Sequence, residues 1–137
     1  MGIVVNDLSK TKDFWMNTLG FKLHVEAIEE SPYIDELLAI KDPALTTVKL
    51  IDSKGFIVEL LKFKNYPVEN SWCGDLKTNG LTHIALTVDD LDELVNKLKK
   101  QNYSPLSDIK ISPNKKVKVV FIKGPEAIML ELVQELE

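Results

Sequence analysis

The stretch Thr82-His83-Ile84-Ala85-Leu86-Thr87-Val88-Asp89-Asp90-Leu91 decides the fold of this chain. Apolar residues alternate in it with small or polar ones, a pattern typical of a strand with one buried face, and His83 lies on the other face. The aspartates that follow are typical of a helix start. An earlier segment, Gly2-Ile3-Val4-Val5-Asn6-Asp7-Leu8, has the same ending, because its Val5 aligns with Val88 at an offset of 88 − 5 = 83 residues. The chain is therefore built from two similar halves.

A glutamate interrupts an apolar strand near the end of each half. The segment Phe56-Ile57-Val58-Glu59-Leu60-Leu61 matches Ile128-Met129-Leu130-Glu131-Leu132-Val133. Burying an unpaired carboxylate is costly, so each glutamate is expected to face a wet or metal-bearing cavity or to have a specific partner. Because side chains alternate along a strand, the residues on either side of each glutamate should face the helices. We predict that His83, Glu59 and Glu131 form the functional site.

Both halves repeat one order of elements, strand-helix-strand-strand-strand. The first half is expected to hold a strand at 3–5, a helix at 9–19, a strand at 21–27, a short helix at 33–38, and a hairpin of strands at 46–51 and 56–63. The second half is expected to hold a strand at 82–88, a helix at 91–101, a strand around 109, and strands at 117–122 and 128–134. The helix at 33–38 has no counterpart in the second half.

The composition of residues 64–80 changes to Asn, Pro, Gly and other polar residues, which marks a linker. The predicted organisation is thus a first βαβββ module at 1–63, a linker at 64–80 and a second βαβββ module at 81–137. We predict an α+β fold of one compact domain, in which the curved mixed sheets of the two modules enclose a shared cavity.

The bulk properties favour a small-molecule partner. The 137 residues are 45% hydrophobic and 28% charged, and the formal net charge is −4. Such a charge argues against nucleic acid or an anionic membrane as the main partner, since both need a basic face. The single cysteine, Cys73, cannot form an intrachain disulfide, and no signal peptide or membrane span is visible. These features predict a cytoplasmic protein.

These segments together resemble the vicinal oxygen chelate superfamily, the group that contains glyoxalase I, methylmalonyl-CoA epimerase, extradiol dioxygenases and bleomycin-resistance proteins. The resemblance covers nearly the whole chain. In metal-dependent members, each module supplies one metal ligand from its first strand and one from its last strand. The resemblance assigns these positions to His83, Glu59 and Glu131. The fourth position falls at residue 0, one before Met1, so the ligand is either lost with a truncated strand or does not exist.

The resemblance implies a glyoxalase-like or epimerase-like lyase or isomerase that moves a proton next to a carbonyl of a small thiol adduct or acyl-CoA. A divalent Zn, Ni, Co or Mn ion would polarise the substrate oxygen, and a glutamate would act as base. Glu131 is the candidate base, and Glu59 is the equivalent residue of the other module. Two carboxylates make an extradiol dioxygenase less fitting, since iron oxygenases prefer two histidines and one carboxylate. A homodimer is expected, because such sheets expose edges that pair symmetrically.

Other interpretations of the same residues remain open. A metal-free binding protein of the bleomycin-resistance type, which takes up an antibiotic or metabolite, is the alternative, and the missing ligand supports it. A histidine that begins a strand is often structural, and each glutamate could face solvent on an edge strand. His24, on the polar face of a half-buried strand, has no repeat partner and could at most replace the missing ligand. The lysine-rich run at 114–118 could hold a substrate carboxylate or phosphate, although a solvated loop is the simpler reading.

Overall fold

The computed structural model describes residues 1–69 and 75–137 and divides the chain into two compact units, Met1–Asn70 and Ser71–Glu137. The division falls inside the segment 64–80, where the composition changes. The finer module bounds and the shared cavity stay predictions. Cys73 lies outside the described residues.

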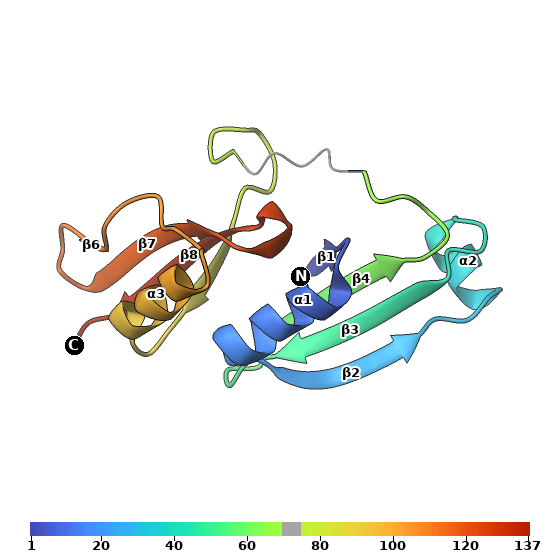
Figure 1. The fold of residues 1–137 in the computed structure, drawn as a ribbon, viewed down its shortest axis with the longest axis horizontal. Helices are drawn as coiled ribbons and strands as arrows, with labels where there is room; N and C mark the ends of the chain where they lie inside the picture. Colours follow the sequence, from blue (N-terminus) through green and yellow to red (C-terminus); the bar gives the residue numbers. More distant parts are fainter. Residues whose placement is uncertain (70–74) are drawn as a thin grey trace. The chain divides into compact units, whose positions relative to one another are not determined.

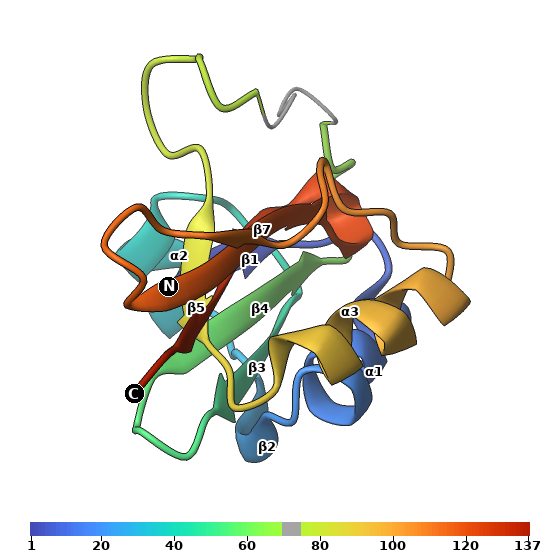
Figure 2. The same ribbon diagram turned by 90° about the vertical axis from the view of Figure 1, so that its left-hand side faces the viewer.

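The first unit is a four-stranded mixed sheet with helices (Figure 1). Its elements are β1 (Gly2–Val4), α1 (Leu8–Asp13), a π-helical continuation (Phe14–Thr18), β2 (Lys22–Ile28), α2 (Tyr33–Leu38), β3 (Leu45–Ile51) and β4 (Ile57–Phe63). The strand order is β1-β4-β3-β2, with β1 parallel to β4 and the other pairs antiparallel. β3 and β4 run side by side in both views (Figures 1 and 2).

The second unit has the same topology. Its elements are β5 (Ile84–Thr87), α3 (Leu91–Lys100), β6 (Lys110–Ile111), β7 (Val117–Lys123), a 3-10 turn (Pro125–Ala127) and β8 (Met129–Glu135). The order β5-β8-β7-β6 repeats that of the first unit, again with the first and last strands parallel. The predicted α+β fold of two βαβββ modules is therefore confirmed.

The strand register reproduces the sequence offset. Gly2 lies opposite Glu59 in the first unit, and Ala85 lies opposite Glu131 in the second. Gly2 and Ala85 are thus equivalent positions, and they are 85 − 2 = 83 residues apart. His83 stands two residues before Ala85, so its equivalent in the first unit would precede Met1.

Each first helix begins at an aspartate that caps it. The Asp7 side chain accepts a hydrogen bond from the backbone N–H of Lys10 (2.9 Å), and Asp90 accepts one from Glu93 (2.9 Å). These side chains satisfy N–H groups that a helix start leaves without a partner. Both caps belong to the matched segments that revealed the repeat. None of the helices among residues 1–69 and 75–137 is long and apolar enough to span a membrane.

The core of each unit lies on one face of its sheet. Val58 and Leu60 of β4 and Leu130 and Leu132 of β8 are fully buried, whereas Glu59 and Glu131 between them are half-buried. Alternation along a strand therefore places both glutamates on the face opposite these core residues, as the sequence predicts. The buried helix residues, among them Trp15 of the first unit, complete the cores.

The first helix differs from the prediction of 9–19 in its bounds and in its second half. It begins at Leu8, and residues Phe14–Thr18 are π-helical. Here the backbone N–H of Leu19 bonds the carbonyl of Phe14 at 3.1 Å. The wider turn brings Trp15 against Phe21, whose ring centroid lies 5.0 Å away in an edge-to-face contact. The change from an α-helical to a π-helical turn thus goes together with packing of aromatic rings. Periodicity along the sequence does not predict such packing.

The strand predicted at 21–27 is present as β2, but the prediction that it is half-buried is wrong. β2 is exposed along nearly its whole length, and Leu23 and Val25 are each 45% exposed. β2 lies at the edge of its sheet, where β3 is its neighbour in the part of the chain that the structure describes, and its register shifts between Leu23 and Val25. A register shift disrupts the alternation of faces, so the period-2 pattern does not translate into burial here.

Thr11 of α1 offers a test of polar burial. Its hydroxyl is buried and makes no hydrogen bond to any residue that the structure describes. We expect Thr11→Val, which is nearly isosteric, to raise the free energy of unfolding by about 1 kcal/mol, because an unsatisfied buried hydroxyl is costly. Thr47→Val is the matched control and should lower it by about 1 kcal/mol, since the Thr47 hydroxyl donates to Glu29 at 2.9 Å. Urea unfolding of both variants measures the signs, and a destabilised Thr11→Val would contradict the prediction.

Candidate functional site

Glu131 lies in the interior of the second sheet. Its strand β8 stands between β5 and β7, and Glu131 faces Ala85 on one side and Phe121 on the other. Paired residues share a face of the sheet, so Ala85, Phe121 and Glu131 all lie opposite the helix-covered core. The Glu131 side chain is 27% exposed. An edge-strand glutamate in solvent, the simpler reading of this position, is therefore wrong for Glu131.

His83 meets Glu131 on this face. The His83 Nε2 atom lies 3.2 Å from the Glu131 Oε2 atom, and the His83 side chain is 34% exposed. The register explains this contact. Ala85 lies opposite Glu131, and His83 precedes Ala85 by two residues, so the His83 side chain lies on the same face of the sheet as Glu131. The structure thus brings together two of the three residues that the sequence singled out.

Two further groups hold the imidazole. The Thr82 Oγ1 atom lies 2.8 Å from Nδ1 of His83. The Phe121 ring stands edge-to-face against the imidazole at a centroid distance of 5.2 Å. Glu131 and Thr82 therefore contact the two ring nitrogens of His83, and Phe121 contacts its ring. These three contacts limit the orientations of the ring.

Glu59 is the equivalent carboxylate of the first unit, with a different neighbour. Its Oε2 atom lies 3.4 Å from Nζ of Lys49, and the two side chains are 31% and 45% exposed. Lys49 lies opposite Glu59 on β3, as Phe121 lies opposite Glu131 on β7. Where the second unit has an aromatic ring, the first unit therefore has a cation. A partly exposed pair of this kind stabilises the fold by about 0–1 kcal/mol.

Sequence reasoning missed three of these neighbours, namely Lys49, Phe121 and Thr82. The first is not given by the predicted hairpin. A turn at 52–55 would pair Ile51 with Phe56 and Lys49 with Val58, whereas in the structure Ile51 faces Ile57 and Lys49 faces Glu59. The second pair cannot be counted either, because a 3-10 turn lies between β7 and β8. The Thr82 contact has no sequence signal.

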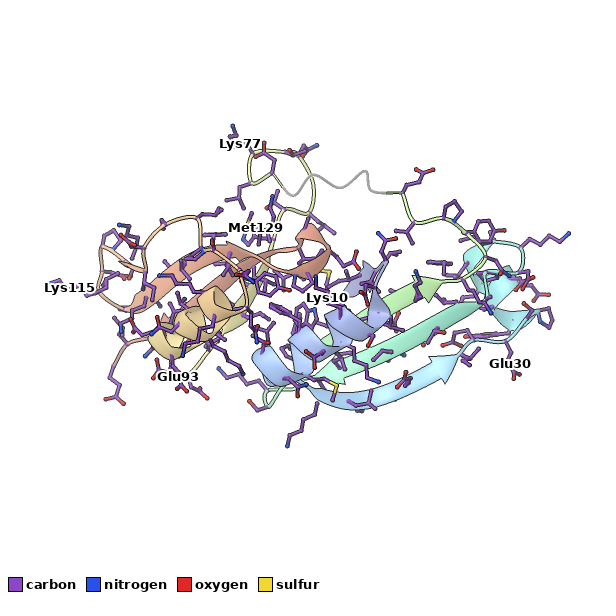
Figure 3. The ribbon with its side chains drawn as sticks, in the orientation of Figure 1. Lys10, Glu30, Lys77, Glu93, Lys115 and Met129 are labelled. Atoms are coloured by element: carbon purple, nitrogen blue, oxygen red, sulfur yellow. The ribbon has the colours of Figure 1, made fainter. Side chains whose placement is uncertain are left out.

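His24 does not take the place of a β1 ligand within its own unit. It lies on β2, and β1 and β2 are opposite edges of the sheet. Three strand spacings of about 4.8 Å separate these strands, roughly 14 Å in all. The lysine-rich run is exposed at Lys115, whose side chain extends away from the loop between β6 and β7 (Figure 3).

The donor types of the His83 and Glu131 pair fit a divalent metal. An imidazole nitrogen and a carboxylate oxygen suit Zn, Ni, Co and Mn, and a spacing of about 3 Å is what two neighbouring ligands of one ion show when each bond is about 2.1 Å. The pair supplies two ligands. Across residues 1–69 and 75–137, no group of three or more His, Cys, Asp or Glu side chains is gathered to hold an ion.

The sequence and the fold place the chain in a known class of protein. Residues 1–121 match the sequence profile of the Glyoxalase/Bleomycin resistance protein/Dioxygenase superfamily. The chain belongs to this superfamily, and the resemblance to the vicinal oxygen chelate superfamily is confirmed. The match includes Glu59 and His83, whereas Glu131 lies beyond it.

Individual relatives agree with this assignment. The chain is 26% identical over 135 residues to the uncharacterised protein YaeR of Escherichia coli (strain K12), which covers 98% of this chain and 93% of that protein. A glyoxalase family protein from Bacillus cereus has the same fold, with a TM-score of 0.89, 22% identity, and coverage of 100% of this chain and 92% of its own. A glyoxalase I variant from Zea mays gives a TM-score of 0.69 at 20% identity, over 99% of this chain and 44% of its own.

Proposed function

We propose that the protein is a divalent-metal-dependent lyase or isomerase that moves a proton next to a carbonyl group of a small thiol adduct or acyl-CoA. The observation that carries the proposal is the contact between His83 Nε2 and Glu131 Oε2 at 3.2 Å on the open face of the second sheet. His83 and Glu131 are the proposed metal ligands of this unit. Glu59, at the equivalent position of the first unit, is proposed as a further ligand.

The chemistry divides between the ion and the side chains. A bound divalent metal would polarise the substrate carbonyl and stabilise the negative charge that develops on its oxygen. Glu131 is the proposed base, because a half-buried carboxylate can remove a proton from the carbon next to that carbonyl. Phe121, opposite Glu131, offers an apolar surface against which the carbon skeleton of the substrate can pack.

The metal-free binding protein stays the second candidate, and the first unit supports it. The Lys49 ammonium beside Glu59 already balances the charge of this carboxylate. Ile57 and Leu61, on either side of Glu59 and on the same face, are half-buried apolar residues. An apolar surface with one ion pair suits a small organic ligand that is held without a metal.

Two measurements separate these candidates. Mass spectrometry of protein purified without chelator or affinity tag reports the bound metal, and a stoichiometric transition metal favours the enzyme. Proton NMR in D₂O then follows exchange of the hydrogen next to the carbonyl in a panel of thiol adducts and acyl thioesters. Protein that binds no metal after incubation with Ni or Zn, and that exchanges no such hydrogen, would rule out the enzyme in favour of the binding protein.

Lys49 provides a prediction for Glu59. If Glu59 is a metal ligand, Lys49→Met should strengthen metal binding by up to about fivefold, because the competing cation of a partly exposed pair is removed. Calorimetric titration with Zn²⁺ measures the change. Lys54→Met, which removes the same charge from the turn of the same hairpin, is the control and should leave the affinity unaltered. Equal or weaker binding in Lys49→Met would argue that Glu59 is not a ligand.

A homodimer is also proposed. Within residues 1–69 and 75–137, no strand pairs with the outer edge of β2, and Leu23, Val25 and Ile28 are exposed there. Exposed apolar edges favour symmetric association. Sedimentation velocity at micromolar concentration is expected to give a dimer, and a single species of monomer mass would contradict this prediction.

A further inference from the structure

The short stretch before β5 brings two neighbouring side chains together. Thr82 is half-buried, and its Oγ1 atom lies 2.8 Å from Nδ1 of His83. Both residues stand just before β5, which begins at Ile84. Thr82 is therefore placed to act on the imidazole of His83.

The two ring nitrogens of His83 face groups of different chemistry. Nε2 faces the carboxylate of Glu131 at 3.2 Å, and Nδ1 faces the hydroxyl of Thr82 at 2.8 Å. An ionised carboxylate can only accept a hydrogen bond, whereas a hydroxyl can donate or accept. A neutral imidazole with its hydrogen on Nε2 donates to Glu131, and its Nδ1 then accepts from Thr82. With the hydrogen on Nδ1, the ring donates to Thr82, and the Nε2 lone pair is open to a cation beside Glu131.

We propose that Thr82 is the positioning residue that lets His83 change tautomer when a metal binds. The inference rests on the proposed function, in which His83 binds the ion through Nε2. With an ion on Nε2, the ring would carry its hydrogen on Nδ1, the Nε2 hydrogen having been released to solvent and another taken up at Nδ1, and the Thr82 hydroxyl would only have to rotate from donating to accepting. The hydrogen bond to Nδ1 is kept in both states, so the ring does not have to turn. A residue that can only donate, or only accept, would serve one of the two states.

Nitrogen-15 NMR of the histidine ring in the intact protein tests the contact without metal. We compare wild type with Thr82→Val, which removes the hydroxyl at nearly equal volume, and with Thr82→Ser, which keeps it. In metal-free protein the Nδ1 signal of His83 should shift in Thr82→Val, because the hydrogen bond that Nδ1 accepts is lost, and should return toward the wild-type position in Thr82→Ser. Adding Zn²⁺ to wild type should move the ring hydrogen to Nδ1.

Calorimetric titration with Zn²⁺ tests the role in binding. Thr82→Val should bind Zn²⁺ about 10–100-fold more weakly, the usual loss when the outer partner of a metal-binding histidine is removed, and Thr82→Ser should stay close to wild type. Thr87→Val is the control, because Thr87 lies on β5 and is exposed. It should keep the wild-type affinity and the wild-type Nδ1 signal.

Two results would overturn the inference or its basis in distinguishable ways. If Thr82→Val keeps both the wild-type Nδ1 signal and the wild-type affinity for Zn²⁺, Thr82 does not position His83. If wild type binds no Zn²⁺, the proposed function fails, and the role of Thr82 in metal binding fails with it. The Nδ1 signal of metal-free Thr82→Val still reports whether the hydrogen bond exists in that case.

Discussion

Replacing Glu131 with glutamine is expected to lower turnover by about 10²–10⁴-fold, because the change removes the proposed base. It also removes one charge from the proposed metal site, so metal affinity should fall in the same protein. The fold should survive, since glutamine is nearly isosteric and the side chain lies opposite the fully buried Leu130 and Leu132. Hydrogen exchange next to the substrate carbonyl measures the first effect, and calorimetric titration with Zn²⁺ measures the second.

Glu135→Gln is the matched control for this experiment. Glu135 is on the same strand, four residues on and so on the same face, and it is exposed. It should keep both turnover and metal affinity. Glu59→Gln is informative in a different way, since a larger loss of turnover there would make Glu59 the base. Normal turnover in Glu131→Gln would remove Glu131 from the mechanism.

His83→Ala is expected to weaken metal binding by more than about 100-fold, beyond the usual effect of losing an outer partner of a ligand. The stability of metal-free protein should change by less than about 1 kcal/mol, because the ring is 34% exposed and its loss leaves no closed void. Calorimetric titration with Zn²⁺ measures the affinities of wild type and variant, and urea unfolding measures the stability.

The other histidine of the chain is the natural control. His24→Ala removes an exposed imidazole from β2 and should leave metal affinity as in wild type. Equal affinities of wild type and His83→Ala for the metal would contradict the assignment of His83 as a ligand. Glu59 and Glu131 would then be polar residues on the open faces of their sheets, and the binding protein would become the better candidate.

Much of the candidate site is readable from local patterns. Alternation around Ile84 and Leu86 puts His83 on the face away from the core, and the same rule puts Glu131 there. These are statements about which face a side chain occupies, and a period of two residues suffices for them. The contact between His83 and Glu131 needs more, because it depends on the parallel register of β5 and β8, which joins residues far apart in the sequence. The repeat nevertheless suggested it.

The sequence by itself determined the doubled βαβββ order, the start of the second-half helix at Leu91, and the faces of both glutamate strands, because each depends on residues a few positions apart. Only the tertiary structure decided the exposure of β2. An edge position and a register shift cancel the burial that its alternation predicts. Tertiary structure also decided what touches the site. Lys49 beside Glu59 and Phe121 beside His83 come from strand pairing, and Thr82 contacts His83 in the stretch just before β5. Such contacts follow from how strands are aligned in space, and no local periodicity encodes that alignment.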